Sequence, residues 1–294
     1  MGLNLHGHVD CISCMIQKYD GIADRYYKTK EEKYEFMRKV MELILASKSH
    51  KTAPYISAKI NALLNENFGI DDPYFDEKEY FNKAILALKP EVKSKLERSS
   101  EPLKEHLKYA AAGNIIDFGA LKNITDELVF STIEDVLKQD IDEETFSDFE
   151  NDLQNAKTLV YLGDNCGEIV FDSLLVEYLS KTYPNLKIYF GVRGKPILND
   201  VLKKDALLVG IDNWAEIAEN GTAIPGTDLE EVSPEYRKLV ESADIIISKG
   251  QGNFETLSNC GLNIYYVFLC KCERIVKALD KEMFSLMFIN EQKI

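Results

Sequence analysis

The stretch TLVYLGDNCGEIVFD, residues 158–172, decides the fold of this chain. It begins with a short apolar run, Leu159–Leu162, that is typical of a buried strand, and Gly163 ends the run. Helical spacing resumes a few residues later, so Asp164 and Asn165 lie in a turn between a strand and a helix. In an open α/β sheet such a turn lies at the carboxyl edge of the strand, where these folds bind anionic or phosphorylated ligands. The two side chains are therefore our first candidates for a functional site.

Further β-prone runs follow in the carboxyl-terminal half, at Ile188–Val192, Ala206–Val209, Ile245–Ile247 and Ile264–Leu269. Helix-like segments separate most of them, and strands that alternate with helices predict a largely parallel sheet covered on both faces. Polar clusters follow several of the runs: GDN at 163–165, RGKPILND at 193–200, GIDNW at 210–214 and SKGQGNFE at 248–255. Since the carboxyl ends of parallel strands share one edge of a sheet, we expect these clusters to meet there.

The amino-terminal half has a different pattern, because residues 30–137 are helical almost throughout. Their apolar spacing predicts helices at 31–48, 55–68, 76–88 and 92–112, punctuated by Pro54, Pro73 and Pro90. The acidic segment 139–154 contains neither Gly nor Pro, so we expect a helical or packed connection there rather than a loose linker. We therefore predict an α-helical domain at residues 1–150 and an α/β domain at residues 151–294.

The composition limits the classes of function. A net charge of -14 disfavours a surface for nucleic acid, whose phosphates require a basic footprint. No run approaches the roughly 18 apolar residues of a membrane span, and Met1–Asp10 lacks a signal pattern, so we expect a cytoplasmic protein without a membrane partner. Six cysteines in a chain without such a signal are better interpreted as thiols or metal ligands than as a disulfide framework.

Side chains that can bind a metal gather near the amino terminus, where LHGHVDCISC contains His6, His8, Cys11 and Cys14. Imidazole and thiolate suit zinc or another borderline-soft metal, so this segment is a candidate for a metal or redox site. The two cysteines equally fit the first turn of a helix, at i and i+3, with thiols that are simply buried. Both interpretations stay open.

The segment AAAGNIIDFGAL interrupts the helical half with Gly113, Asn114, Asp117 and Gly119. Small residues with one amide and one carboxylate suit a backbone that approaches a ligand closely. A glycine at the end of one helix, followed by an aspartate that caps the next, explains the same residues equally well.

The clusters at the expected sheet edge combine oxygen ligands with a lysine. Asp164, Asn165 and Asp200 offer an all-oxygen set that suits a hard cation such as Mg²⁺ or Mn²⁺. Lys249 leads into GQGN, whose glycines let backbone N–H groups turn toward an anion. A cation that activates water, together with a lysine that neutralises developing charge, would hydrolyse a phosphomonoester. Each residue has a plainer explanation: Asp164 as a helix cap, Asp200 on a surface helix, and Lys249 in solvent.

Five motifs together carry a family resemblance: CISC, GNIIDFG, GDNCGEIVFD, KPILND and ADIIISKGQGNFETL. In this order they resemble the damage-control phosphatases, the metal-dependent family also described as domain of unknown function 89. The resemblance is closest to the prokaryotic subfamily marked by CxxC and GNFE. It implies an α-helical amino-terminal part joined to a Rossmann-like α/β/α domain with a largely parallel sheet, and a site between them.

The resemblance also assigns roles to particular residues. It implies a divalent metal, Mn²⁺, Ni²⁺, Co²⁺ or Mg²⁺, held by Asp164, Asn165 and Asp200. It implies that the substrate phosphate meets Lys249, Gly250, Gln251, Gly252 and Asn253, with Glu168 beside them and with Asn114 and Asp117 approaching from the helical part. The implied partner is a small phosphorylated metabolite: a sugar phosphate, a phosphopantetheine compound or a damaged metabolite.

Rival functions are weaker. A methyltransferase that uses S-adenosylmethionine, or a dinucleotide-dependent oxidoreductase, would need a glycine repeat that GDNCGE lacks. A phosphatase that forms a covalent aspartyl intermediate would place a second aspartate where Cys166 stands, so we favour attack by water. A non-catalytic protein that binds metal, or senses redox state, through the amino-terminal His and Cys residues is the remaining alternative.

Overall fold

A six-stranded sheet lies at the centre of the computed structural model, which describes residues 5, 9–48, 50–69, 71–116 and 126–294. The strands are β1 (Thr158–Leu162), β2 (Lys187–Val192), β3 (Glu216–Glu219), β4 (Ile245–Lys249), β5 (Ile264–Leu269) and β6 (Leu286–Asn290). Their order is β3-β2-β1-β4-β5-β6, and only β6 runs antiparallel to its neighbour. This is the strand order of doubly wound sheets, so the predicted α/β class with a largely parallel sheet is confirmed.

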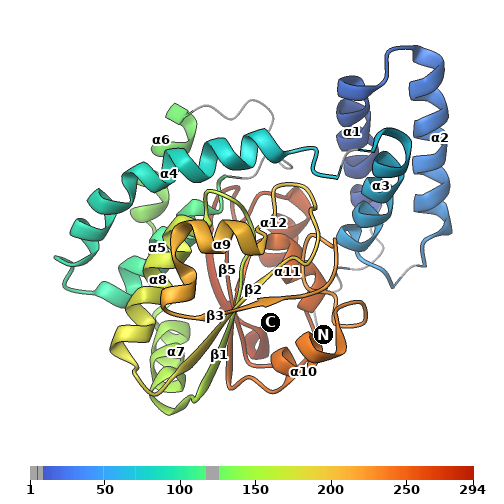
Figure 1. Ribbon diagram of the computed structural model, residues 1–294. Helices are drawn as coiled ribbons and strands as arrows, with labels where there is room; N and C mark the ends of the chain where they lie inside the picture. Colours follow the sequence, from blue (N-terminus) through green and yellow to red (C-terminus); the bar gives the residue numbers. More distant parts are fainter. Residues whose placement is uncertain (1–4, 6–8, 49, 70, 117–125) are drawn as a thin grey trace.

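Alternate residues of the strands face two different hydrophobic cores. On β1, Leu159 and Tyr161 belong to one core, and Val160 and Leu162 belong to the other. Such burial on both faces explains why the central strands read as continuous apolar runs. The helices on the first face are α4 (Phe75–Leu96), α5 (Pro102–Gly113), α6 (Asp126–Leu137), α7 (Glu143–Asn155), α8 (Ile169–Thr182) and α9 (Lys203–Val209). Those on the second face are α10 (Pro234–Glu241), α11 (Gly250–Leu257) and α12 (Glu273–Leu279) (Figure 1).

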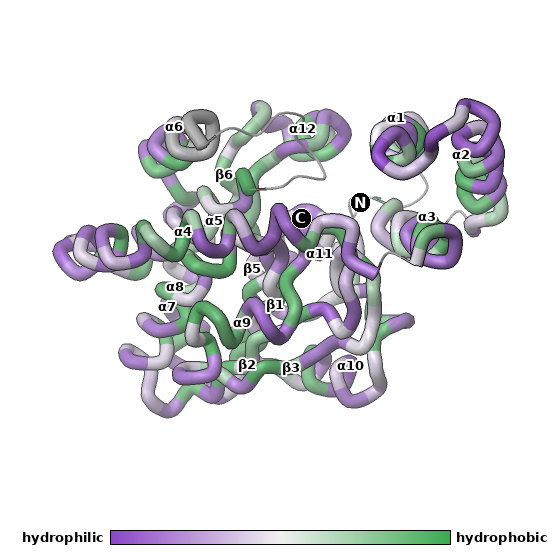
Figure 2. The backbone as a smooth tube through the Cα atoms, turned by 45° about the horizontal axis from the view of Figure 1, so that its top comes forward, coloured by the Kyte–Doolittle hydropathy of each residue, from purple (hydrophilic) through white to green (hydrophobic). Residues whose placement is uncertain are grey.

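The first three helices have a hydrophobic core of their own. They are α1 (Val9–Tyr26), α2 (Lys30–Ala46) and α3 (Ala53–Phe68), and their core includes Tyr19, Val40 and Ile60. This group stands beside α11 and α12 rather than on a face of the sheet (Figure 2). By contrast, α4–α7 share the first core of the sheet. The acidic segment 139–154 forms most of helix α7, as expected, whereas the domain boundary at residue 150 stays a prediction.

The prediction of a strand at Ala206–Val209 is wrong, because these residues form the end of helix α9. Asp205 Oδ2 accepts from the backbone N–H of Leu202 at 2.9 Å, which caps the first turn, and Gly210 ends the helix at φ 81°. A four-residue apolar run carries too little periodicity to distinguish the two structures. The cluster GIDNW at 210–214 therefore follows a helix, and it does not join the sheet edge.

Pro90 does not separate two helices as predicted, because α4 continues through it to Leu96. A proline inside a helix costs about 3 kcal/mol, so contacts on both sides must compensate. Lys89 Nζ donates to the carbonyl of Val209 at 2.8 Å, and Lys93 Nζ pairs with Glu177 at 2.6 Å. These contacts hold α4 against the helices that cover the sheet.

The two edge strands were not predicted. β3 is a four-residue strand with a glutamate at each end, and β6 is the antiparallel strand at the opposite edge. Short, charged edge strands such as β3 are common because they discourage pairing with other chains, and they carry a weak apolar signal. Among the described helices, none combines the length and the hydrophobicity that crossing a membrane requires. The cytoplasmic location itself stays a prediction.

Candidate active site at the carboxyl edge of the sheet

The turn after β1 is paired with the segment that carries Asp200. The backbone N–H of Val201 donates to the carbonyl of Asp164 at 2.9 Å, and Asn165 forms an isolated antiparallel bridge with Asp200. The exposed fractions of Asp164, Asn165 and Asp200 are 7%, 3% and 2%. Asp200 therefore does not lie on a surface helix, and the three predicted metal ligands come together at one place.

Burial and the neighbouring negative charges disfavour the ionised form of Asp164. Its Oδ2 accepts from Asn165 Nδ2 at 2.7 Å and from Asn114 Nδ2 at 3.1 Å. Burial raises the pKa of Asp164 well above its usual range, and the carboxylates of Glu168 and Asp200 raise it further. Because clustered, desolvated carboxylates favour a bound cation, two carboxylates and one amide oxygen at this point fit a hard divalent metal. Asp164 is also not the cap of α8, since Glu168 occupies that position.

Arg193 lies among these carboxylates, although the sequence analysis gave it no role. It is fully buried, its Nε donates to Asp200 Oδ2 at 2.6 Å, and its Nη2 lies 3.7 Å from Asp164 Oδ1. Neither Nη atom makes a hydrogen bond within the part of the chain that the structure describes. The signal was its position directly after β2, at the start of the cluster RGKPILND. The guanidinium balances part of the negative charge and fixes Asp200.

Lys249 is buried rather than solvated. Its Nζ donates to Glu168, to Asp172 Oδ1 at 2.7 Å and to the carbonyl of Ala110 at 2.9 Å. Burial alone would lower its pKa, but the carboxylates of Asp172 and Glu168 outweigh burial and raise it. Lys249 is therefore a charged group at the centre of the site, and its contact with a substrate phosphate stays a prediction.

Asp172 is the second acidic partner of Lys249, and its role was not predicted. Its Oδ1 accepts from Tyr161 at 2.6 Å, and its buried Oδ2 has no partner among the described residues. Burial raises the pKa of Asp172 to about 7, against the opposing effect of Lys249. The group therefore holds its proton through the weakly acid range.

The glycine-rich segment forms the first turn of α11 and touches Asp164. Gly250 has φ 75°, and a Cβ atom there would overlap Asp164 Oδ2, so only glycine fits. Asn253 Nδ2 donates to the carbonyl of Lys249 at 2.8 Å, which fixes the turn. The first N–H groups of a helix have no partner within the helix and attract anions. In α11, Gly250, Gln251 and Gly252 contribute these N–H groups at the carboxyl end of β4.

Asn114 extends from the end of α5 into the site. Its Nδ2 donates to Glu168 Oε2 at 3.0 Å as well as to Asp164, and its Oδ1 accepts from the N–H of Leu269 at 3.2 Å. Lys271 Nζ, which the sequence analysis missed, donates to the Asn114 carbonyl at 2.6 Å. Gly113 is the last residue of α5, as the capping explanation predicts, and Asn114 contacts the carboxylates of Asp164 and Glu168, as the close-approach explanation predicts. Asp117, like His6 and His8, lies outside the described residues.

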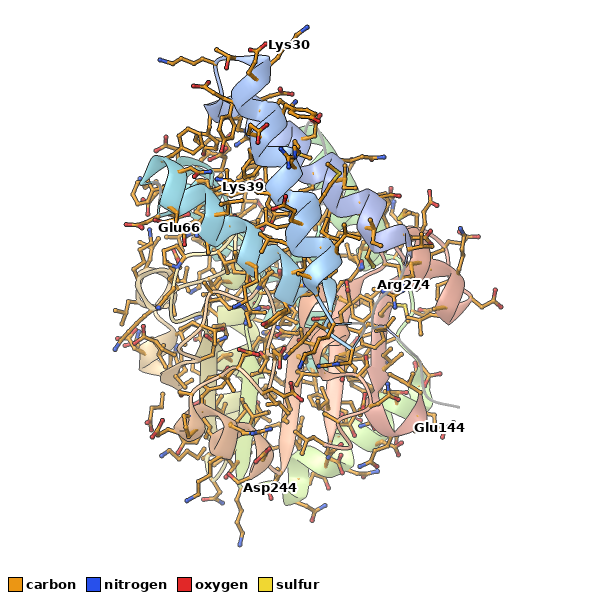
Figure 3. All side chains as sticks on the ribbon, turned by 90° about the vertical axis from the view of Figure 1, so that its right-hand side faces the viewer. Lys30, Lys39, Glu66, Glu144, Asp244 and Arg274 are labelled. Carbon is orange, nitrogen blue, oxygen red and sulfur yellow. The ribbon has the colours of Figure 1, made fainter. Side chains whose placement is uncertain are left out.

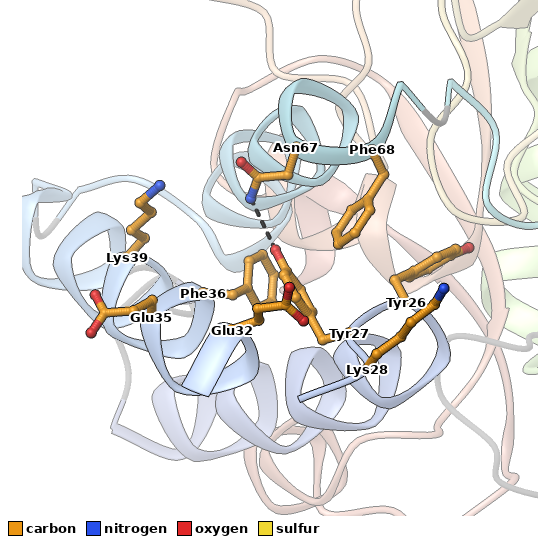
Figure 4. Close-up of a pocket in the computed structure, with 9 residues that line it drawn as sticks. All are labelled: Tyr26, Tyr27, Lys28, Glu32, Glu35, Phe36, Lys39, Asn67 and Phe68. Atoms are coloured by element: carbon orange, nitrogen blue, oxygen red, sulfur yellow. Dashed lines mark hydrogen bonds between the residues drawn. The ribbon is translucent and has the colours of Figure 1, made fainter. Parts of the chain in front are cut away.

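Two other features do not belong to this site. Cys166 is buried in the first core, with its Sγ 3.9 Å from the carbonyl of Asp200, so it acts as a small packing residue. A pocket of about 640 Å³ lies instead among α1–α3 (Figure 4). It is lined by Tyr26, Tyr27, Lys28, Glu32, Glu35, Phe36, Lys39, Asn67 and Phe68, none of which is a predicted site residue.

The fold and the cluster define an α/β protein with a candidate metal and phosphate site at the carboxyl edge of its sheet. The family model of the damage-control phosphatase ARMT1-like domain matches residues 8–287. The chain therefore belongs to this family, as its motifs indicated.

Relatives of known sequence and structure agree with this assignment. An uncharacterised protein of Methanocaldococcus jannaschii is 33% identical over 284 residues, which cover 93% of this chain and 92% of that protein. A damage-control phosphatase of Pyrococcus horikoshii is 28% identical, covering 92% of this chain and 93% of that one. A damage-control phosphatase of Archaeoglobus fulgidus is 32% identical, covering 76% and 77%. The crystal structure of a DUF89 family protein from Pyrococcus horikoshii aligns with a TM-score of 0.85 at 25% identity, covering 98% of this chain and 100% of that one. These names support a phosphatase role.

Proposed function

We propose that this chain is a metal-dependent phosphatase that hydrolyses small phosphomonoesters with water as the nucleophile. The observation that carries the proposal is the convergence of Asp164, Asn165 and Asp200 with Lys249 and the first turn of α11. Family membership supports the reaction class. The substrate classes we propose are sugar phosphates, phosphopantetheine compounds and damaged phosphorylated metabolites.

The metal would be held by the carboxylates of Asp164 and Asp200 and by the amide oxygen of Asn165. When bound, it would polarise the phosphoryl oxygens and increase the acidity of a water molecule. Mn²⁺, Ni²⁺, Co²⁺ and Mg²⁺ all accept such oxygen ligands. Arg193 holds Asp200 in place through the bond from its Nε.

The remaining residues bind and orient the phosphate. The N–H groups at the start of α11, which begins directly after β4, favour an anion. Lys249 contributes a fixed positive charge, because Glu168 and Asp172 keep its pKa raised. Asn114 anchors the side chains of Asp164 and Glu168 from the helical part. Each of these contacts exists before substrate arrives, so little reorganisation would accompany the reaction.

The test is release of inorganic phosphate from a panel of sugar phosphates, phosphopantetheine and an aryl phosphate. Metal-stripped protein is assayed with each of the four metals added back. We expect turnover that requires metal and that falls by at least about 100-fold in Asp200→Ala, since a ligand is lost. Asp212→Ala, at an exposed position in the short helix Ile211–Asn213, is the matched control and should retain full activity.

Two outcomes would contradict the proposal. If folded protein releases no phosphate with any of the four metals, the proposed hydrolysis is ruled out. If phosphate release persists in Asp200→Ala, the active site does not include Asp200. Binding of S-adenosylmethionine by both proteins would favour a methyltransferase, which the names of the relatives do not support.

A further inference from the structure

The CxxC motif, which the proposed reaction does not use, lies against the second face of the α/β domain. Cys11 and Cys14 are in the first turns of α1, and Arg274 of α12 donates from Nη1 to Cys11 Sγ at 3.1 Å. Arg274 is labelled on the side of the molecule that faces the viewer in Figure 3. Cys11 is partly buried and Cys14 is exposed, so one thiol of the pair is open to solvent while the other is held by a guanidinium.

A buried carboxylate acts on the same thiols through its charge, because Glu255 raises the pKa of both Cys11 and Cys14. Glu255 extends from α11, and its Oε2 is enclosed without a hydrogen-bond partner among the described residues. Burial raises the pKa of Glu255 to about 7, and Arg274 and Lys18 oppose that rise. An enclosed carboxylate that titrates near neutrality can accept a proton from a neighbouring group at physiological pH. Glu255 therefore has the acidity of a general base, and it is the largest charge effect on the pKa of Cys11.

Four residues contribute to the charge around the pair. Burial raises the pKa of Cys11, with Glu255 and Cys272 raising it further and Arg274 opposing. Burial also raises the pKa of Cys14, where Lys18 opposes and Cys272 and Glu255 contribute. Glu255 is the largest charge effect on Cys11, whereas its effect on Cys14 is the smallest of the four causes. The carboxylate is thus the leading charge effect on the partly buried thiol only.

We propose that Cys11 and Cys14 form a thiol–disulfide exchange site, with Glu255 as proton acceptor and Arg274 as the partner of the Cys11 thiolate. Its substrate class is a small-molecule disulfide. The pair has the spacing for an internal disulfide, since residues at i and i+3 on a helix are neighbours and the first turn can tighten. Neither cysteine is among the residues of the candidate active site.

The exchange proceeds in two balanced steps. Cys14, which is exposed, first loses its proton to water, and its thiolate attacks one sulfur of the small disulfide. The S–S bond of the small disulfide breaks, a mixed disulfide forms on Cys14, and the small thiolate that leaves takes a proton from water. Cys11 then loses its proton to Glu255, and its thiolate attacks the Cys14 sulfur. This step forms the Cys11–Cys14 disulfide and releases the second small thiolate. The two protein thiols are oxidised by two electrons, and the small disulfide is reduced to two thiols.

A zinc site is the competing explanation for clustered cysteines. Structural zinc requires four ligands. The Arg274 guanidinium at Cys11 Sγ occupies the position where a cation would be needed. The geometry therefore favours redox chemistry over metal binding.

The first experiment exposes the full chain to glutathione buffers of increasing oxidised fraction. Thiols are then alkylated, and the modified peptides are identified by mass spectrometry. We expect one Cys11–Cys14 disulfide that dithiothreitol reverses. Cys11→Ser should stop at a mixed disulfide on Cys14, and Cys260→Ser, at a partly buried cysteine of another segment, should behave as the wild type. Six free thiols in fully oxidised glutathione, a disulfide between other cysteines, or zinc released by a mercurial would each overturn the proposal.

The second experiment isolates the role of Glu255. Acid-quenched time points at pH 7 separate the mixed disulfide from the final disulfide by intact mass. In Glu255→Gln, we expect mixed disulfide to form at least as fast, because a negative charge beside the thiols is removed. Resolution by Cys11 should slow by at least about tenfold, because its proton acceptor is lost. Equal rates of resolution in the two proteins would refute the role of Glu255, and folding of the variant is checked by its urea midpoint.

Discussion

Replacing Lys249 with methionine tests the account of the site most directly. Lys249 is fully buried and its Nζ makes three contacts, to two buried carboxylates and to the carbonyl of Ala110. Methionine has a similar length and no charge, so packing is largely kept while Glu168 and Asp172 lose their cation. Removing one partner of a buried ion pair costs about 3–5 kcal/mol, since the other charge stays buried without compensation. We expect the free energy of unfolding to fall by this amount at pH 8.

The loss should depend on pH in a defined direction. The pKa of folded Asp172 is about 7, above the roughly 3.9 of an unfolded aspartate. Between these values the folded state binds more protons, so Asp172 contributes stability at low pH that is lost as the pH rises toward 7. Without Lys249 the carboxyl is even harder to ionise, and the loss extends to higher pH. The difference between variant and wild type should therefore be smaller at pH 5.5 than at pH 8.

Urea unfolding followed by circular dichroism at both pH values measures this difference. Lys138→Met is the matched control, because Lys138 forms a surface pair with Asp135 in which both side chains are more than 70% exposed. It should leave the midpoint unchanged. A loss below about 1 kcal/mol in Lys249→Met at pH 8, or a loss that does not change with pH, would show that Lys249 is not the buried counterion described here.

Three further substitutions test other parts of the structure. Gly250→Ala should reduce the rate of phosphate release by at least about 100-fold, because the added Cβ would displace Asp164. Gly261 is the control, because it has a similar φ but open space around it, so Gly261→Ala should cost only about 1–2 kcal/mol of stability and leave activity unchanged. Arg193→Met should lower the rate of phosphate release or the affinity for metal about 10–100-fold, and both are measured by titrating Mn²⁺ into the assay. A titration curve unchanged from that of the wild type would contradict the positioning role of Arg193. Glu255→Gln should gain stability relative to the wild type as the pH rises from about 5 to 8, because the pKa of Glu255 in the folded state, near 7, lies above its unfolded value. A difference in urea midpoint between the two proteins that is the same at pH 5 and pH 8 would argue against this effect.

The sequence located the central strands because their signal is local. β1, β2, β4 and β5 are buried on both faces, and such strands appear as continuous apolar runs followed by polar turns. The rule that parallel strands share a carboxyl edge then brought Asp164, Asp200 and Lys249 together without any structural information. The same reasoning failed at Ala206–Val209, where an apolar run belongs to a short helix whose cap depends on Asp205.

Residues that act through long-range contacts were beyond sequence reasoning. Arg193 reads as an ordinary charged residue of a surface loop, and only the pairing of segments 164–166 and 199–201 places it between two carboxylates. One of the three partners of Lys249 is the carbonyl of Ala110, 139 residues away. No local propensity encodes such a contact, because it arises when α5 packs against the sheet.

The run AAAG before Asn114 shows how packing completes the site. Ala110, Ala111 and Ala112 are fully buried, and a Cβ on Gly113 would lie 2.8 Å from the ring of Phe171 and 3.3 Å from the backbone of Glu168. Side chains this small let α5 approach α8 closely enough for its carbonyls and Asn114 to reach the carboxylates. A larger residue at Gly113 would move α5 outward and withdraw the Asn114 amide from Asp164. The small residues of the helical half are therefore a condition for the polar site, although none of them is polar.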